Sequence, residues 1–171
     1  MYTTLITAQE LQALQQTPQP VLLLDVRFDL NDATFGQQVY DVGHIAGAHY
    51  LHLDRELSGV VSGHNGRHPL PDPQLLADRL GAAGVTPRTQ VVVYDDAGGM
   101  VAVRLWWLLR WLGHDQVAWL DGGIGQWQKE GRPLSRAVPR AAAATGSVAN
   151  SAKTSGLAQF RSGCLGENRC R

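Results

Sequence analysis

The stretch that decides the fold runs from Thr89 to Gly113 and reads TQVVVYDDAGGMVAVRLWWLLRWLG. Its first part, residues 91–93, is a run of β-branched valines, which is typical of a strand buried on both faces of a parallel sheet. A short loop follows at residues 95–99, and residues 100–112 are predicted to form an almost wholly apolar, buried helix. In α/β folds, a strand, tight loop and helix of this kind gather backbone N–H groups around a site.

This loop carries acids and glycines where chemistry is expected. Asp95 and Asp96 are followed by an alanine and two glycines, and the loop contains no cysteine, serine, lysine or histidine. Aspartate near the N-terminus of a helix is favourable because it faces the positive end of the helix dipole. We therefore interpret the loop as a structural cap, and a weak catalytic or metal-binding role for the two aspartates is the alternative.

Composition limits the class of protein. The 171 residues suit one domain with a segment left over, and a hydrophobic fraction of 44% is enough for a packed core. Fifteen basic and fifteen acidic side chains give a formal net charge of zero, so neither nucleic acid nor a membrane surface is expected as a partner. The first residues lack a signal-peptide pattern, and both cysteines, Cys164 and Cys170, lie near the end, which favours a cytoplasmic protein without a disulfide scaffold.

Two further buried strands are predicted around this central stretch. Residues 21–27 end on Asp25 and Arg27, whose side chains point the same way because strand side chains alternate; we interpret them as a structural ion pair. Residues 117–120 form the other strand, and Asp121 with two glycines leads from it into a short helix. Strands and helices alternate with short links, so the predicted fold class is α/β, an open parallel sheet with helices on both faces.

Local signals place two more helices. Thr7 and Glu10 match a capping box at the start of a short amphipathic helix. Asp72, followed by a proline at the first helical position, predicts a second helix over residues 74–84. Residues 28–38 are polar and are expected to form a loop.

Three histidines that lie close together raise the question of a metal site. His44, His49 and His52 match no compact zinc spacing, and no nearby cysteine or acidic pair completes a ligand set. We therefore expect no metal here and expect such histidines to bond to the backbone near turns. Residues 49–53 are predicted to form a short strand.

The end of the chain differs in composition from the rest. Alanine, serine and threonine dominate residues 135–171. This segment has several basic side chains but a single acidic one, Glu167. Such a segment buries too little apolar surface to fold alone, so we expect a disordered tail or a truncated or altered start of a second domain. No buried strand precedes Cys164 and no apolar helix follows it, so this cysteine is not expected to act as a nucleophile.

Between residues 5 and 134 the chain resembles the rhodanese family of sulfurtransferases. The resemblance rests on four pieces in this order and at these distances: LDVR at residues 24–27, GHIAGA at 43–48, Tyr94-Asp95 before a glycine-rich turn, and LDGG at 120–123 with Trp127 and Gly131. It implies an α/β domain with a central parallel sheet, no cofactor and four structural motif residues, namely Asp25, His44, Asp121 and Trp127.

Two more pieces resemble the first domain of tandem enzymes that move sulfur from thiosulfate or 3-mercaptopyruvate. They are GRHPLP at residues 66–71 and AVRLWW at residues 102–107. In those enzymes the second domain carries the persulfide-forming cysteine, and the first domain serves as a wall of the cleft. When this chain is aligned with the cysteine-containing loop of those catalytic domains, the position of the cysteine corresponds to Asp96, within one residue. The resemblance thus implies no catalytic residue here, and three residues that line the cleft or its interface with a cysteine-bearing domain: Arg27, His68 and Arg104.

A non-catalytic rhodanese-like binding or regulatory module is the alternative function. Trp106, Trp107 and Trp111 lie on one predicted helix, where an exposed patch would mark a docking surface and a buried one would belong to the core. A phosphatase or arsenate reductase is disfavoured, because those enzymes need a cysteine followed by an arginine across the loop, and residues 95–99 hold neither. If the chain is active, its ligand is expected to be a small sulfur-containing anion.

Overall fold

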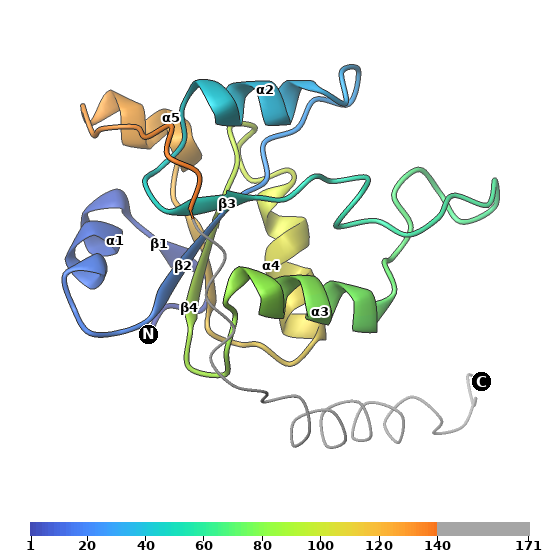
Figure 1. Ribbon diagram of the computed structural model, residues 1–171, viewed down its shortest axis with the longest axis horizontal. Helices are drawn as coiled ribbons and strands as arrows, with labels where there is room; N and C mark the ends of the chain where they lie inside the picture. The colour runs from blue at the N-terminus through green and yellow to red at the C-terminus, as the bar shows by residue number, and fades with distance from the viewer. Residues whose placement is uncertain (140–171) are drawn as a thin grey trace, which may run out of the picture. The chain divides into compact units, whose positions relative to one another are not determined.

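A five-stranded sheet with helices on both sides forms the body of the protein (Figure 1). The computed structural model describes residues 1–139, so both cysteines and the predicted tail from residue 140 onward lie outside the described residues. In chain order the elements are β1 (Leu5–Ile6), α1 (Ala8–Gln15), β2 (Val21–Asp25), α2 (Phe35–Val42), β3 (Ala48–Tyr50), α3 (Pro73–Ala83), β4 (Gln90–Tyr94), α4 (Ala102–Trp111), β5 (Val117–Leu120) and α5 (Gly123–Lys129). The spatial order is β1-β5-β4-β2-β3 and every pairing is parallel, which confirms the predicted open parallel sheet.

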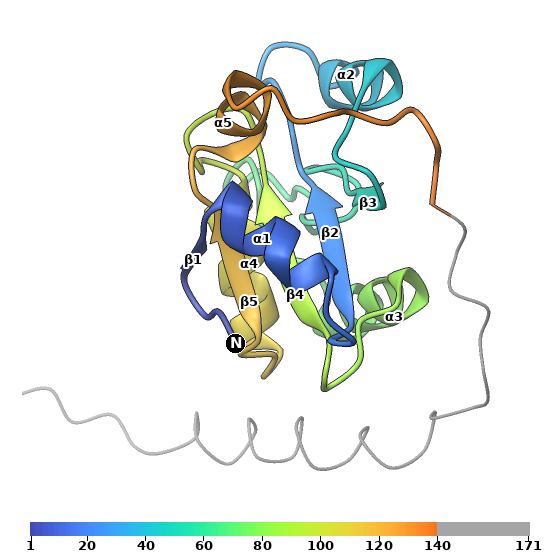
Figure 2. The same ribbon diagram turned by 90° about the vertical axis from the view of Figure 1, so that its left-hand side faces the viewer.

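The central strands bury both of their faces. Leu22 and Leu24 of β2 belong to one core, together with side chains of α3 and α4. Leu23 and Val92 belong to the other core, which α1 and α5 cover. Figure 2 shows α1 and α5 on one side of the sheet and α3 and α4 on the other. The continuous apolar runs in the sequence follow from this double burial.

The predicted helix starts are confirmed. Thr7 and Glu10 form the complete capping box of α1, in which each side chain accepts the other residue's backbone N–H. Asp72 caps α3 by accepting two backbone N–H groups of its first turn, and Gly84 ends the helix in the left-handed region at φ 106°.

One prediction was wrong, because the segment expected to be a loop at residues 28–38 contains the first part of α2. Gly36 lies within this helix and is a poor helix former, which hides the helix in the sequence. The structure needs glycine here, because a Cβ would lie 2.0 Å from the carbonyl oxygen of Arg27 and 2.3 Å from the hydroxyl of Tyr50. Packing of α2 against the end of β2 therefore overrides its local propensity.

Strand β1 was not predicted, and strand β3 differs from its prediction. The edge strand β1 has two residues, too few to show a periodic pattern in the sequence. The strand expected at residues 49–53 lies at Ala48–Tyr50, because it pairs only with β2, which itself ends at Asp25 opposite Tyr50.

Candidate functional site

The turn between β4 and α4 is built around the side chain of Asp95. Its Oδ1 accepts the backbone N–H groups of Ala97 and Gly99 at 3.1 and 2.8 Å. Its Oδ2 accepts those of Val101 and Ala102, both at 2.9 Å. The N–H groups that converge at the start of α4 are thus bound to a buried carboxylate. Because charge-assisted bonds of this kind are strong, the turn is a satisfied structural cap.

Neighbouring segments close the turn from two sides. Gly99 lies against the ring of Trp119, where a Cβ would stand 2.6 Å from the nearest ring atom. The carbonyl oxygen of Asp95 accepts the N–H of Ile124 at 3.0 Å, and a Cβ on Gly123 would lie 2.2 Å from that oxygen. The turn after β5 therefore packs directly on the turn after β4 and holds its shape.

Asp96 lies outside this ring of hydrogen bonds. Its side chain is exposed, and partial desolvation is the largest influence on its carboxyl, raising the pKa above the ordinary value of 3.8. The sequence comparison with the family puts the cysteine position on Asp96, within one residue, whereas the N–H groups of the turn meet at the side chain of Asp95. The difference arises because spacing alone does not show which of two adjacent side chains turns inward.

Asp25 and Arg27 form the expected ion pair at the end of β2. Arg27 Nη2 lies 2.7 Å from Asp25 Oδ2, and Nε lies 3.0 Å from the same oxygen. Nη2 also donates to the carbonyl oxygen of Gly43 at 2.8 Å, and both side chains are buried. Arg27, a candidate cleft residue, therefore uses its donors to join β2 to the turn before β3.

Arg104, the second candidate, ties a long loop to α4. Its Nε and Nη2 donate to the carbonyl oxygen of Leu57 at 3.1 and 3.0 Å. Nη2 also donates to the carbonyl oxygens of His68 and Pro69, both at 3.0 Å. One guanidinium thus holds both legs of the loop that joins β3 to α3. Desolvation lowers the pKa of this group, yet three carbonyl acceptors keep its charge compensated.

His68, the third candidate, pairs with an acid that the sequence did not single out. Its Nδ1 lies 3.0 Å from Asp54 Oδ1. Its Nε2 is buried and has no hydrogen-bond partner within residues 1–139. One ring nitrogen of His68 thus lies at ion-pair distance from a carboxylate, and the other faces no polar partner among the described residues. No local spacing signal links Asp54 to His68, because the whole 55–67 segment separates them.

The three clustered histidines do not converge. His44 lies between the carbonyl oxygens of Tyr40 and Ala137, at 2.9 and 3.1 Å from its two ring nitrogens. His52 Nε2 lies 2.8 Å from the carbonyl oxygen of Ala33. The expectation that histidines here bond to the backbone is confirmed for these two. In the part of the chain that the structure describes, no group of three or more histidine, cysteine or acidic side chains is placed to hold a metal ion.

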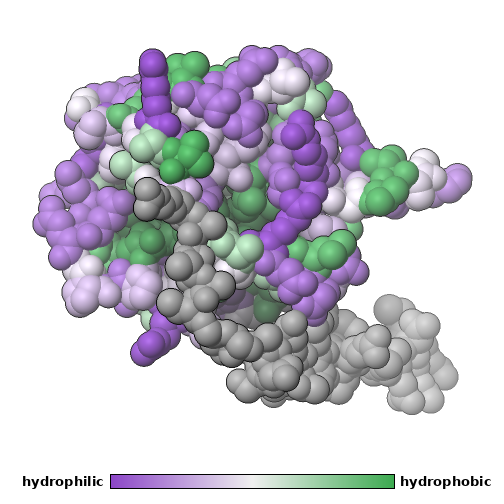
Figure 3. All heavy atoms as spheres, in the orientation of Figure 1, coloured by the Kyte–Doolittle hydropathy of each residue, from purple (hydrophilic) through white to green (hydrophobic). Residues whose placement is uncertain are grey.

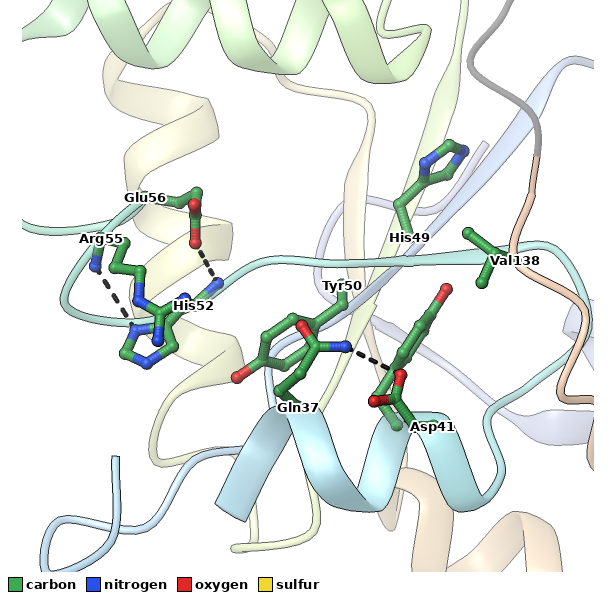
Figure 4. A pocket seen from close by; sticks show the side chains of 9 residues that line it. Gln37, Asp41, His49, Tyr50, His52, Arg55, Glu56 and Val138 are labelled. Atoms are coloured by element: carbon green, nitrogen blue, oxygen red, sulfur yellow. Dashed lines mark hydrogen bonds between the residues drawn. The ribbon is translucent and has the colours of Figure 1, made fainter. Parts of the chain in front are cut away.

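An open pocket of about 320 Å³ lies beside these histidines, between α2 and the segment after β3 (Figure 4). Figure 4 shows His49 and His52 pointing in different directions from this segment. The acids that line it are engaged, since Asp41 accepts from Gln37 and Glu56 accepts the N–H of His52. None of Asp95, His68 and Arg104 lines this pocket, so it is separate from the turn.

The two other motif residues, Asp121 and Trp127, make contacts that join parts of the fold. Trp127 is buried, and its Nε1 donates to the carbonyl oxygen of Pro133 at 3.0 Å. The Arg132 guanidinium lies over the Trp127 ring, 5.2 Å from its centroid. The backbone N–H of Asp121 donates to the carbonyl oxygen of Ile6, which joins the turn after β5 to β1. Within residues 1–139 no helix has the length and apolar character needed to cross a membrane.

The sequence matches the rhodanese-like domain family over residues 7–130. The chain belongs to the rhodanese family. A probable 3-mercaptopyruvate sulfurtransferase of Pseudomonas aeruginosa is 50% identical to this rhodanese domain over 133 residues, which are 77% of this chain and 46% of the relative. A putative thiosulfate sulfurtransferase of Mycobacterium tuberculosis is 39% identical and aligns over 74% of this chain and 44% of its own length. This chain therefore spans about half the length of these curated relatives.

Solved structures show the same architecture. The 3-mercaptopyruvate sulfurtransferase of Leishmania major superposes with a TM-score of 0.70 at 27% identity, over 82% of this chain and 39% of that one. The enzyme of Escherichia coli gives a TM-score of 0.69 at 26% identity, over 82% of this chain and 54% of that one. The sulfurtransferase family and the rhodanese fold expected from the sequence are both confirmed.

Proposed function

We propose that this rhodanese domain is the non-catalytic domain of a thiosulfate or 3-mercaptopyruvate sulfurtransferase. In this proposal, Asp95 stands where a catalytic rhodanese domain carries its cysteine, and a separate cysteine-bearing domain supplies the sulfur acceptor. The observation that carries the proposal is the set of four hydrogen bonds that the Asp95 carboxylate accepts.

The chemistry of sulfur transfer explains why this carboxylate matters. With thiosulfate, an enzyme thiolate attacks the sulfane sulfur, the S–S bond breaks, and sulfite leaves with the bonding electron pair. Cyanide then attacks the outer sulfur of the persulfide, which releases thiocyanate and regenerates the thiolate. The thiolate and the anionic donor both need N–H donors and positive charge. Asp95 uses those N–H groups, and Asp96 adds a second acid beside them.

His68 and the 57–69 loop are the parts of this domain proposed to face the shared cleft. The Nε2 atom of His68 is buried without a polar partner within the described residues, and its Nδ1 lies 3.0 Å from Asp54 Oδ1. Arg27 and Arg104 contribute by positioning backbone segments, since their donors are bound to carbonyl oxygens. We also propose a cytoplasmic location. Both cysteines, Cys164 and Cys170, lie close together in the sequence, a pattern that does not suggest a disulfide scaffold. Cell fractionation tests this location.

A chimeric enzyme tests the proposal. The 133 matching residues of the Pseudomonas aeruginosa relative are replaced by those of this chain, and thiocyanate formation is measured with thiosulfate and with 3-mercaptopyruvate as donors. We expect turnover by the chimera with at least one donor and none by this chain alone. An inactive but folded chimera would contradict a role in sulfur transfer.

A binding or regulatory module is the second candidate, and the exposed ring of Trp107 favours it. This side chain is 45% exposed on α4, which is unusual for so large an apolar group. Such a module would capture a partner without supporting turnover in the chimera. The chimera therefore separates the two functions.

A further inference from the structure

The pocket between α2 and the segment after β3 is lined by two opposite charges that have no counter-ion. Within residues 1–139, the exposed guanidinium of Arg55 has no hydrogen-bond or ion-pair partner. In the same range, the Asp41 carboxylate accepts one hydrogen bond, at 2.9 Å from the neutral amide of Gln37. Figure 4 shows Arg55 on one side of the Tyr50 ring and Asp41 on the other. The two charges therefore face one pocket without pairing with each other.

The other titratable groups of the pocket are already bound or uncharged. Glu56 Oε1 lies 2.7 Å from Arg79 Nη1, and Glu56 Oε2 accepts the N–H of His52 at 2.7 Å. The ring nitrogens of His52 are bonded to backbone groups. Desolvation lowers the pKa of His49, which favours its neutral form. One positive and one negative charge thus remain for a ligand to neutralise.

Two phenol rings line the same pocket. The ring centroids of Tyr40 and Tyr50 lie 5.6 Å apart, with an angle of 38° between the planes. Desolvation raises the pKa of each phenol to about 12, so both stay neutral at physiological pH. The charge of Asp41 also acts to raise the pKa of Tyr40, and that of Arg55 acts to lower the pKa of Tyr50. Each charge therefore lies near a phenol ring that a ligand could contact.

This lining disfavours several classes of ligand. An anion without a positive group would be repelled by Asp41, and a cation without a negative group would be repelled by Arg55. An apolar compound would displace water from both charges without replacing its hydrogen bonds. Figure 3 shows mainly hydrophilic residues on the surface around α2. The volume of about 320 Å³ is at the lower end of the range for small-molecule sites, so a small molecule with both charges fits best.

We propose that this pocket binds a small zwitterion of the α-amino acid type. The ligand carboxylate lies on the Arg55 guanidinium, whose planar fork can donate two parallel N–H bonds to it. The ligand ammonium group lies on the Asp41 carboxylate. The ligand side chain lies against the tyrosine rings and Val138, which is 72% exposed. Exposed charges are ordinary one by one, and the inference rests on two opposite ones that line a single pocket.

The proposed site is independent of the proposed function. Neither Asp95 nor His68 lines the pocket, and no step of sulfur transfer enters the inference. Binding is therefore measured in the full chain without any assay of turnover, so each proposal can fail while the other stands.

Three matched compounds test the charge requirement. L-Leucine carries both charges, isocaproate lacks the ammonium group, and isoamylamine lacks the carboxylate. Each compound is titrated into the full chain with isotope-labelled tyrosine, and the ring signals are followed by NMR. Tyr40 and Tyr50 report on the pocket, and Tyr2, which lies outside it beside Gln90, is the internal control.

We expect L-leucine to shift the signals of Tyr40 and Tyr50 saturably, with a dissociation constant of about 1 mM, because both ion pairs would be solvent-exposed. Isocaproate and isoamylamine should each bind at least about fivefold more weakly. Equal binding of L-leucine and either analogue would show that one charge suffices and would overturn the proposal. The same conclusion follows if L-leucine causes no saturable shift up to about 20 mM in the folded chain.

Charge-neutralising variants locate the site. Asp41→Asn and Arg55→Gln should each weaken L-leucine binding at least about fivefold. Asp78→Asn is the matched control, because Asp78 accepts from Gln74 at 2.9 Å on α3 in the same way that Asp41 accepts from Gln37 on α2. It should leave the dissociation constant unchanged. If Asp41→Asn binds L-leucine as tightly as Asp78→Asn does, the ligand does not use Asp41 and the proposal is wrong.

Discussion

The carboxylate of Asp95 accepts a hydrogen bond from the backbone N–H of Ala102, the first residue of α4, at 2.9 Å. The same carboxylate accepts three other N–H groups of the turn, and its own backbone oxygen accepts the N–H of Ile124 in the next turn. One buried acid thus fixes the start of α4 and joins two turns at the carboxyl edge of the sheet. The same acid occupies four of the N–H groups that converge at this turn.

Replacing Asp95 with asparagine should destabilise the protein. The amide oxygen can accept on one side only, and the amide N–H₂ group would face two backbone donors. We expect Asp95→Asn to lower the free energy of unfolding by about 2–3 kcal/mol, measured by urea denaturation. Asp96→Asn is the matched control, because its side chain is exposed, and should change stability by less than about 0.5 kcal/mol near neutral pH. Equal losses in the two variants would contradict the assignment of the inward side chain.

The pKa of Asp96 gives a pH dependence with a definite sign. Desolvation raises the pKa of this carboxyl above 3.8, so the folded protein binds its proton more tightly than the unfolded chain does. Its contribution to stability is complete below pH 3.8 and is lost as the pH rises through the folded-state pKa. Relative to Asp96→Asn, the wild-type protein should therefore lose stability as the pH rises from below 3.8, which denaturation at a series of pH values measures. A wild-type protein that gains stability relative to Asp96→Asn as the pH rises would contradict this sign.

Removing the Arg104 guanidinium should loosen the 57–69 loop. Arg104→Met leaves three carbonyl oxygens without their charged donor, and we expect a loss of about 2 kcal/mol together with faster backbone hydrogen exchange at Gly59. Arg110→Met on the same helix is the control. Arg110 is exposed and makes a long ion-pair contact of 3.5 Å with Asp115, so its loss should have little effect on stability. Exchange at Gly59 that is unaffected by Arg104→Met would show that the loop does not depend on this side chain.

Breaking the buried ion pair should be costly. Arg27→Met leaves the Asp25 carboxylate buried without its partner and leaves the Gly43 carbonyl oxygen without a side-chain donor. We expect a loss of about 3–5 kcal/mol, measured by thermal and urea denaturation. A loss below about 1 kcal/mol would mean that water reaches the pair when the arginine is absent.

A cysteine placed in the turn should report on its N–H groups. In the chain with Cys164→Ser and Cys170→Ser, we expect Asp95→Cys to give a thiol whose pKa lies below the usual value of about 8.5, because backbone donors stabilise the thiolate. Asp96→Cys, one residue away, should keep a pKa near that value. The pH dependence of alkylation measures both, and a lower pKa at position 96 than at position 95 would reverse the assignment.

The sequence predicts the parts of the fold that depend on local physics. Continuous apolar runs identify the central strands because β2 and β4 are buried on both faces. The caps at Thr7 and Asp72 form between residues two or three positions apart in the chain. Helix α2 escapes prediction because Gly36 is selected by contact with Arg27 and Tyr50, which only the folded chain brings together.

The sequence predicts which residues belong to the candidate site, but it does not predict their contacts. The sequence identifies the acidic turn and its two aspartates, but which of them points inward depends on the backbone path after β4. Likewise, the sequence identifies Arg104 and His68 as residues of interest. Their partners, the carbonyl oxygen of Leu57 and the carboxylate of Asp54, lie far from them in the chain, so no spacing pattern reveals them.

The most direct test is the rate of thiocyanate formation by the full chain alone, with thiosulfate or 3-mercaptopyruvate as donor and cyanide as acceptor. A turn occupied by the Asp95 carboxylate predicts the uncatalysed rate, both for the wild-type chain and for the chain with Cys164→Ser and Cys170→Ser. Catalysed turnover by the single chain, above all turnover that persists without either cysteine, would contradict the account.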